Sequence, residues 1–182
     1  MSRLPEIRAR EQLHENGRHN WGVISGSRSR VIVPFALLLN SPETAGRIAH
    51  LGTYLRFESS LPGADRELAI LTTAREFDCG FQWPGHVRLA LEEGLRQEVI
   101  DCVAHHLPVE GLTEQEALVI NYCRELYREH RVSDSTFEAA RARYGDKGVA
   151  ELTALMGYYS LMASVINAFD VQPSLGGVTL PR

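Results

Sequence analysis

The sequence has too few cysteines for a disulfide-stapled or cysteine-rich metal protein. Three occur among 182 residues, at Cys79, Cys102 and Cys123. An odd, scattered set of this kind forms neither a disulfide framework nor paired metal-binding knuckles. Unpaired thiols fit a reducing compartment, so we expect a cytoplasmic protein. The N-terminus, MSRLPEIRAREQLHENG, is charged throughout and does not read as a signal peptide.

An excess of charge of one sign is also missing. The 19 Lys and Arg residues nearly balance 23 Asp and Glu residues, which leaves a net charge of −4. This balance gives no electrostatic reason to expect a nucleic acid or an anionic membrane as a partner. Hydrophobic residues make up 44% of the chain, and the length is sufficient for one domain with a hydrophobic core.

Charged residues are absent from one long segment, 152–169, which reads LTALMGYYSLMASVINAF. Its eighteen residues reach the lower limit for a membrane-spanning helix. The segment nevertheless contains six polar side chains: Thr153, Tyr158, Tyr159, Ser160, Ser164 and Asn167. We therefore interpret it as a buried core helix, with a membrane span as the alternative.

Helical periodicity dominates the chain and predicts an all-α, single-domain helical bundle. No internal repeat, second domain or low-complexity segment stands out. Ser41-Pro42-Glu43 is a strong helix start, Thr113 to Glu116 forms a capping box, and Gly94 and Gly145 are helix stops. The predicted helices lie at about 42–57, 64–76, 81–93, 95–107, 114–130, 134–145 and 146–169.

The two ends of the chain are predicted to lie outside this bundle. Residues 5–15 read as a short polar helix, and residues 17–30, rich in Gly, Ser and Arg, as a loop. The apolar run 31–39 fits a strand or a helix, although Pro34 weakens the strand interpretation. The predicted organisation is a helix-and-loop extension over 1–30, the helical domain over 31–171 and a loose tail over 172–182.

Three groups that can move protons lie close together in the sequence: Glu67, Cys79 and His86. Glu67 occurs within an apolar helical pattern, while Cys79 and His86 flank the start of the next helix. A helix N-terminus favours anions and can make a thiol more acidic. If the two helices are antiparallel, the three side chains converge, and we predict that they are catalytic.

Each of these residues also has a structural interpretation. Cys79 fits a small buried hydrophobe, His86 a hydrogen-bonded structural group, and Glu67 a solvated helix residue. Trp83 is interpreted as a packing residue or a substrate contact. Cys102 and Cys123 lie on apolar helix faces and are assigned to the core. A metal site is not expected, because the sequence has no His-Glu-x-x-His and no repeated Cys-x-x-Cys.

The sequence motifs around these residues resemble those of the carboxymuconolactone decarboxylase family, which includes alkylhydroperoxidase D. The resemblance rests on RELAIL (66–71), Cys79, Trp83, His86, Ala90 and Gly94-Leu95, on YLRFESSL (54–61), and on GYY (157–159) and NAF (167–169). It implies an all-helical subunit that assembles into homotrimers or homohexamers. It also implies that Glu67, Cys79 and His86 are the catalytic residues.

The sequence departs from the peroxidase branch of this family at Gln82, where that branch has the second cysteine of a Cys-x-x-Cys pair. We therefore favour a cofactor-free carboxy-lyase, or a related isomerase, acting on a γ-carboxymuconolactone-like small acid in aromatic-compound breakdown. His86 is the expected proton donor and Glu67 its orienting group. A cation for the substrate carboxylates is also needed, and the candidates are Arg56, Arg75 and Arg88.

Two alternatives remain open. The first is a thiol peroxidase of the peroxiredoxin kind, in which Cys79 is the nucleophile and His86 and Glu67 relay its proton. The second is a non-catalytic, oligomeric protein that binds a small acid.

Overall fold

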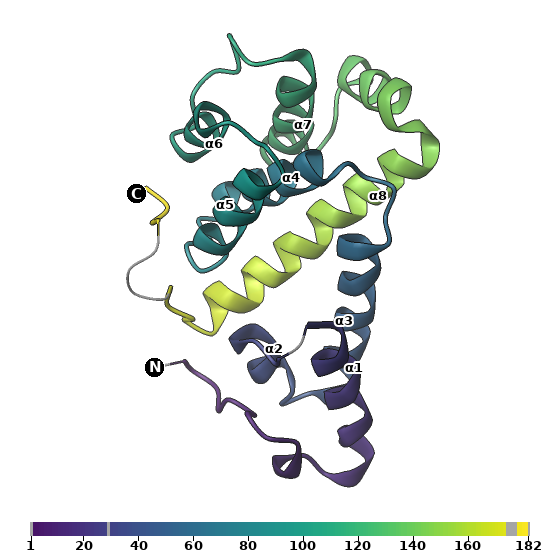
Figure 1. Cartoon of the computed structure of the whole chain (residues 1–182), viewed down its shortest axis with the longest axis vertical. Helices are drawn as coiled ribbons and strands as arrows, with labels where there is room; N and C mark the ends of the chain where they lie inside the picture. The colour runs from purple at the N-terminus through teal and green to yellow at the C-terminus, as the bar shows by residue number, and fades with distance from the viewer. Residues whose placement is uncertain (1, 29, 174–177, 182) are drawn as a thin grey trace.

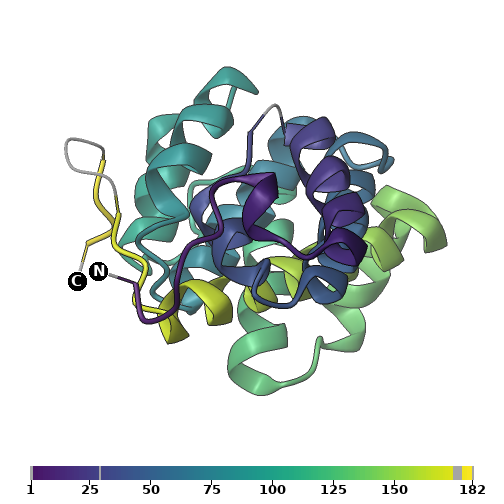
Figure 2. The same ribbon diagram turned by 90° about the horizontal axis from the view of Figure 1, so that it is seen from below.

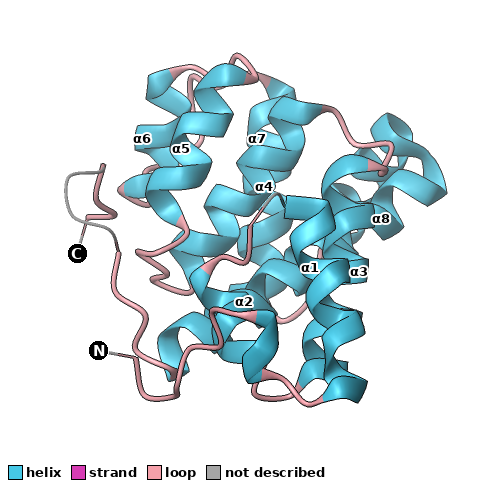
Figure 3. Cartoon of the chain, turned by 60° about the horizontal axis from the view of Figure 1, so that its bottom comes forward, coloured by secondary structure: helices cyan, strands magenta, loops and turns pink. Residues whose placement is uncertain are grey.

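All regular secondary structure in the described residues is helical, which confirms the all-α prediction (Figure 3). The computed structural model describes residues 2–28, 30–173 and 178–181. The helices are α1 (Arg18–Arg28), α2 (Val33–Leu38), α3 (Pro42–Phe57), α4 (Gly63–Glu76), α5 (Trp83–Glu92), α6 (Gln97–Ala104), α7 (Glu114–Arg124) and α8 (Asp134–Ala168).

The long helix α8 crosses the molecule diagonally and separates two groups of helices (Figure 1). α4 to α7 gather on one side of α8, and α1 to α3 lie on the other. α4 packs against α5, α6, α7 and α8. Its residues 67–75 are all buried, as expected for a helix surrounded by other helices.

The uncharged segment 152–169 forms the second half of α8. By length and composition α8 is apolar enough to cross a membrane, but 56% of its most apolar window is buried inside the protein. Leu152, Leu155 and Met156 are fully buried. The core-helix interpretation of this segment is therefore confirmed.

Most predicted helix ends are found where the capping signals place them. The Thr113 hydroxyl accepts a hydrogen bond from the Glu116 N–H, and the Glu116 carboxylate accepts one from the Thr113 N–H. Gly94 and Gly145 have φ values of 89° and 67°, a region that favours glycine. At Gly145 the backbone of α8 leaves helical geometry, which confirms the predicted break between the helices at 134–145 and 146–169.

The prediction for residues 5–15 is wrong. In place of one helix the structure has two short 3₁₀ turns, at Arg10–Gln12 and Glu15–Gly17. The residues before them are tied to the rest of the chain, because the Ile7 N–H donates to the Ala36 carbonyl and the Asn40 amide donates to the Pro5 carbonyl. These long-range bonds replace the local bonds of a helix.

The loop predicted over 17–30 is also wrong, because most of it forms α1. Ile24 of α1 is fully buried, and the Asn20 amide donates to the Glu43 carboxylate of α3. Packing against α3 thus outweighs the weak helix propensity of this Gly- and Ser-rich segment. The ambiguous run 31–39 contains α2, with Pro34 in its first turn, where proline is tolerated.

The two ends of the described chain lie on the same side of the molecule (Figure 2). The Arg3 N–H donates to the Phe169 carbonyl at the end of α8. Of the tail predicted to be loose, residues 174–177 and 182 lie outside the described residues. Further along the tail, the Pro181 carbonyl accepts a hydrogen bond from the Arg75 guanidinium.

Candidate active site

Glu67 and His86 meet between α4 and α5. The His86 Nδ1 atom lies 2.7 Å from Glu67 Oε2, a hydrogen-bond distance. Both side chains are largely buried, with 3% of the Glu67 side chain and 12% of the His86 side chain exposed. The convergence predicted for these two residues is thus present in the structure.

Two side chains lie next to this pair. The Arg66 Nε atom lies 3.9 Å from Glu67 Oε1. The His86 ring meets the Tyr159 ring edge-on, with centroids 5.1 Å apart and an interplanar angle of 88°. Because Nδ1 is engaged by Glu67, the nitrogen of His86 that remains available to a ligand is Nε2.

His86 lines a cavity of about 160 Å³. Arg56 from α3 and Gln82, directly before α5, supply the other charged or amide side chains of its described wall. The rest of the wall is apolar and aromatic and includes Pro34, Phe35, Phe81, Tyr158, Tyr159 and Met162. Glu67 contacts His86 and is not among the described lining residues, so the imidazole lies between Glu67 and the cavity.

Cys79 lies in the loop between α4 and α5, where the chain turns sharply. α4 ends with Asp78 in the left-handed conformation (φ 48°), and the Cys79 N–H donates to the Ala74 carbonyl, as in a Schellman motif. Cys79 is fully buried. It is not among the described residues that line the cavity.

The position of Cys79 before a helix does not make its thiol acidic. Burial raises its pKa to about 11, although hydrogen bonds from the backbone N–H groups of Gln82 and Phe81 act in the opposite direction. The loss of solvation of a thiolate therefore outweighs the favourable position before a helix. Cys102 and Cys123 are buried, as expected.

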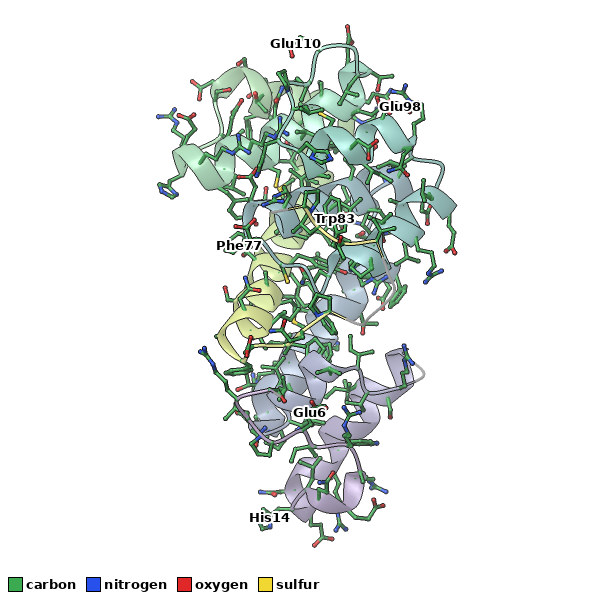
Figure 4. All side chains as sticks on the ribbon, turned by 90° about the vertical axis from the view of Figure 1, so that its left-hand side faces the viewer. Glu6, His14, Phe77, Trp83, Glu98 and Glu110 are labelled. Atoms are coloured by element: carbon green, nitrogen blue, oxygen red, sulfur yellow. The ribbon has the colours of Figure 1, made fainter. Side chains whose placement is uncertain are left out.

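Trp83, the first residue of α5, lies near the middle of the molecule in the view of Figure 4. Only 1% of the residue is exposed, and it is not among the described lining residues of the cavity. Its placement agrees with the packing interpretation and leaves it away from the cavity surface.

Of the three arginines considered for substrate binding, Arg56 lines the cavity with His86. Arg75 forms an ion pair with Asp78 and lines a separate cavity of about 700 Å³ beside the C-terminal tail. Arg88 is exposed and pairs with Glu92.

Sequence reasoning gave Gln82 no role at the site. The residue was noted only because it replaces a cysteine, yet it lies four residues before His86. This spacing places both side chains on the same face of a helix, and it is the signal in the sequence that could have identified Gln82. Within the described part of the chain, no group of three or more His, Cys, Asp and Glu residues is arranged to hold a metal ion.

Residues 42–125 match the family model of the carboxymuconolactone decarboxylase family. This segment of the chain is similar to that family. The matched segment contains Glu67, Cys79 and His86, together with Arg56 and Gln82 from the cavity wall. A search of curated proteins finds no match.

Several solved structures share the fold. An alkylhydroperoxidase AhpD core protein from Ralstonia eutropha, described as an uncharacterized peroxidase-related protein, has a TM-score of 0.73 and 19% identity, covering 96% of this chain and 93% of its own. A peroxidase-related protein from a Silicibacter species has a TM-score of 0.72 and 12% identity, with coverage of 94% and 93%. A protein of unknown function from Agrobacterium tumefaciens, suggested to be an antioxidant defence protein AhpD, has a TM-score of 0.67 and 21% identity, with coverage of 75% and 94%.

Proposed function

We propose that the chain is a cofactor-free acid–base enzyme, a decarboxylase or a related lyase or isomerase, acting on a small organic acid. The observation that carries this proposal is the His86–Glu67 pair at the wall of a small cavity that also contains Arg56. A γ-carboxymuconolactone-like acid from aromatic-compound breakdown is the substrate we favour, because the family match supports it.

In such an unsaturated lactone the bond between the ring and its carboxylate breaks, and CO₂ leaves. The electron pair moves into the ring as a dienolate, conjugated with the lactone carbonyl. The His86 imidazolium then donates its Nε2 proton to the ring carbon, and solvent returns a proton to the ring of His86. Glu67 holds the Nδ1–H group and stabilises the imidazolium, as a carboxylate does beside a catalytic histidine.

A thiol peroxidase is the second candidate, because two of the structural neighbours are described as peroxidase-related. In that reaction the Cys79 thiolate attacks the peroxide and becomes a sulfenic acid, which a second thiol must reduce. The raised pKa of Cys79 opposes the first step. Gln82 occupies the position of the resolving cysteine in the peroxidase branch, so that thiol is missing here. The other two cysteines, Cys102 and Cys123, are buried and are poorly placed to replace it.

Two assays distinguish these reactions: turnover of γ-carboxymuconolactone, and peroxide consumption with a thiol donor. For the lyase, His86→Ala lowers turnover by roughly 10²–10⁴-fold, the usual contribution of a positioned acid or base. Glu67→Gln is also impaired, whereas Cys79→Ser retains most of its activity. Peroxide consumption that disappears in Cys79→Ser would instead support the peroxidase, and inactivity in both assays would support a binding protein.

A further inference from the structure

The Gln82 side chain is a buried amide with an unsatisfied acceptor. The residue is 7% exposed and belongs to the wall of the 160 Å³ cavity. Its Nε2 atom lies 3.5 Å from the Tyr159 carbonyl oxygen, while its Oε1 atom has no hydrogen-bond partner among the described residues. Buried acceptors without partners are uncommon and costly, so this atom is suited to a donor that a ligand brings.

The orientation of this amide follows from its neighbour. Turning the group over would bring Oε1 against the Tyr159 carbonyl, and two acceptors would then face each other. The observed orientation places the donor Nε2 on the carbonyl side. Oε1 is therefore the free atom, and it accepts hydrogen bonds but cannot donate them.

Arg56 gives the same cavity a preference for anions. Its Nε atom is buried without a hydrogen-bond partner, and no ion pair of Arg56 is found within the described residues. No Asp or Glu side chain is among the described residues that line the cavity. A carboxylate is the group that best fits a guanidinium in this setting.

We infer that the ligand of this cavity is a small organic acid that carries a hydroxyl group. Its carboxylate binds Arg56, and its O–H group donates to Gln82 Oε1. This inference rests on the proposed function and narrows its substrate class. γ-Carboxymuconolactone itself has no hydroxyl group, so among lactone-like acids the cavity favours those that carry one. The volume limits the ligand to about one small ring, because an apolar cavity of about 150 Å³ accepts benzene.

Gln82 thus acts as a specificity-determining residue. An acid without the hydroxyl group would leave Oε1 buried and unpaired, and sites built around a hydrogen bond discriminate against such analogues. Because Gln82 and His86 lie one helical turn apart on the same face, the hydroxyl group of the ligand is brought toward the proton-donating imidazole.

The test compares benzoate with 3- and 4-hydroxybenzoate, which share one ring and one carboxylate. Titration calorimetry on the full chain is expected to show that the better hydroxybenzoate binds about 10-fold more tightly than benzoate, the contribution of one hydrogen bond. Gln82→Met and Gln82→Leu are expected to remove this preference while retaining benzoate binding. Gln97→Met, an exposed glutamine on α6, is the matched control and should leave the preference unchanged. Arg56→Met is expected to weaken binding of all three acids.

Equal binding of benzoate and the hydroxybenzoates to the wild-type protein would overturn the inference. A preference that persists in both Gln82 variants would do the same, and so would failure of every acid to bind at millimolar concentration. His86→Ala separates this inference from the proposed function, because it should keep the binding preference while losing turnover. A protein with the expected preference but no turnover of the lactone or of a hydroxylated analogue contradicts the proposed function alone, whereas lactone turnover without the preference contradicts this inference alone.

Discussion

At Cys79 two opposing effects act on one thiol. The backbone N–H groups of Phe81 and Gln82 stabilise a thiolate, whereas complete burial disfavours it, and burial prevails because the pKa rises to about 11. Sequence alone identified the first effect, since the position before a helix is visible in the spacing of Gly80 and Pro84. The second effect depends on how α4 and α5 pack over the loop, which spacing does not determine.

The raised pKa leads to a direct expectation for Cys79 reactivity. At pH 7 only about one thiol in 10⁴ is ionised, against a few per cent for an unperturbed cysteine. Alkylation of Cys79 by iodoacetamide should therefore be at least about 10²-fold slower in the folded protein than in guanidinium chloride. Peptide mapping by mass spectrometry measures this rate separately for each cysteine. Rapid formation of a sulfenic acid at Cys79 in the folded protein would contradict the expectation.

At the scale of the helices, a buried carboxylate joins α3 to α8. Glu151 of α8 accepts hydrogen bonds from the Tyr54 hydroxyl and from both the hydroxyl and the N–H of Ser60. Burial alone would raise its pKa, but these hydrogen bonds outweigh that effect and lower the pKa to about 2. The ionised form is thus favoured in the folded protein.

These hydrogen bonds of Glu151 make the free energy of unfolding depend on pH. The folded-state pKa lies below the unfolded value of about 4.5, so the stabilisation is complete above pH 5 and is lost as the pH falls toward 2. Glu151→Gln should lower the free energy of unfolding by about 1–3 kcal/mol at pH 7, the contribution of hydrogen bonds to a charged group. In urea titrations the difference from wild type should shrink between pH 5 and pH 2. Glu138→Gln, at an exposed position on α8, should show no such trend.

The break in α8 depends on glycine at one position. Gly145 has φ 67° and ψ 175°, a conformation that is essentially restricted to glycine. Gly145→Ala should therefore lower the free energy of unfolding by about 1–3 kcal/mol. The cost comes from the backbone, since an added Cβ would meet no atom within 4 Å.

Gly157→Ala is the matched control for this substitution. Gly157 lies in the regular part of α8, is exposed and likewise has open space around a built Cβ. Alanine there should leave the stability unchanged or raise it by up to about 1 kcal/mol. Equal effects of the two substitutions in urea unfolding would show that the break does not need glycine.

Helices were predictable where local signals define them and were missed where distant contacts do. Capping residues and glycines act within one helical turn, and they define the helix ends at Pro42, Thr113, Gly94 and Gly145. α1 forms because it packs against α3, with Ile24 buried and Asn20 bonded to Glu43. Residues 2–9 form no helix, and they bond instead to α2 and to the end of α8. The site shows the same difference. The Glu67–His86 contact joins successive helices and could be predicted from the sequence, whereas the cavity wall also contains residues of α2, α3 and α8, which only the fold brings together.

At the scale of the whole molecule, one face of α3 is exposed and apolar. Leu51, Tyr54 and Phe57 recur at three-residue spacing and are 46%, 36% and 59% exposed, which places them along one side of the helix. A face of this kind is suited to contact between subunits. We propose that the protein forms the homotrimer or homohexamer that the family resemblance implies.

Light scattering should therefore give a mass near three or six times the 20.3 kDa of one chain. Leu51→Asp, which places a charge on this face, should shift the mass toward that of the monomer. His50→Asp, at the adjacent exposed position, should not. A wild-type protein that stays at 20.3 kDa at micromolar concentration would contradict the proposal.

The segment that matches the family ends well before α8 and begins after α2. Glu67 and His86 lie inside residues 42–125, but Pro34, Phe35, Tyr158 and Tyr159 of the cavity wall lie outside. Relatives recognised through this segment alone can therefore share the glutamate–histidine pair and still differ in the shape of the cavity beside it. Among such relatives a shared pair does not require a shared ligand, and selectivity can diverge through helices that the shared segment does not include.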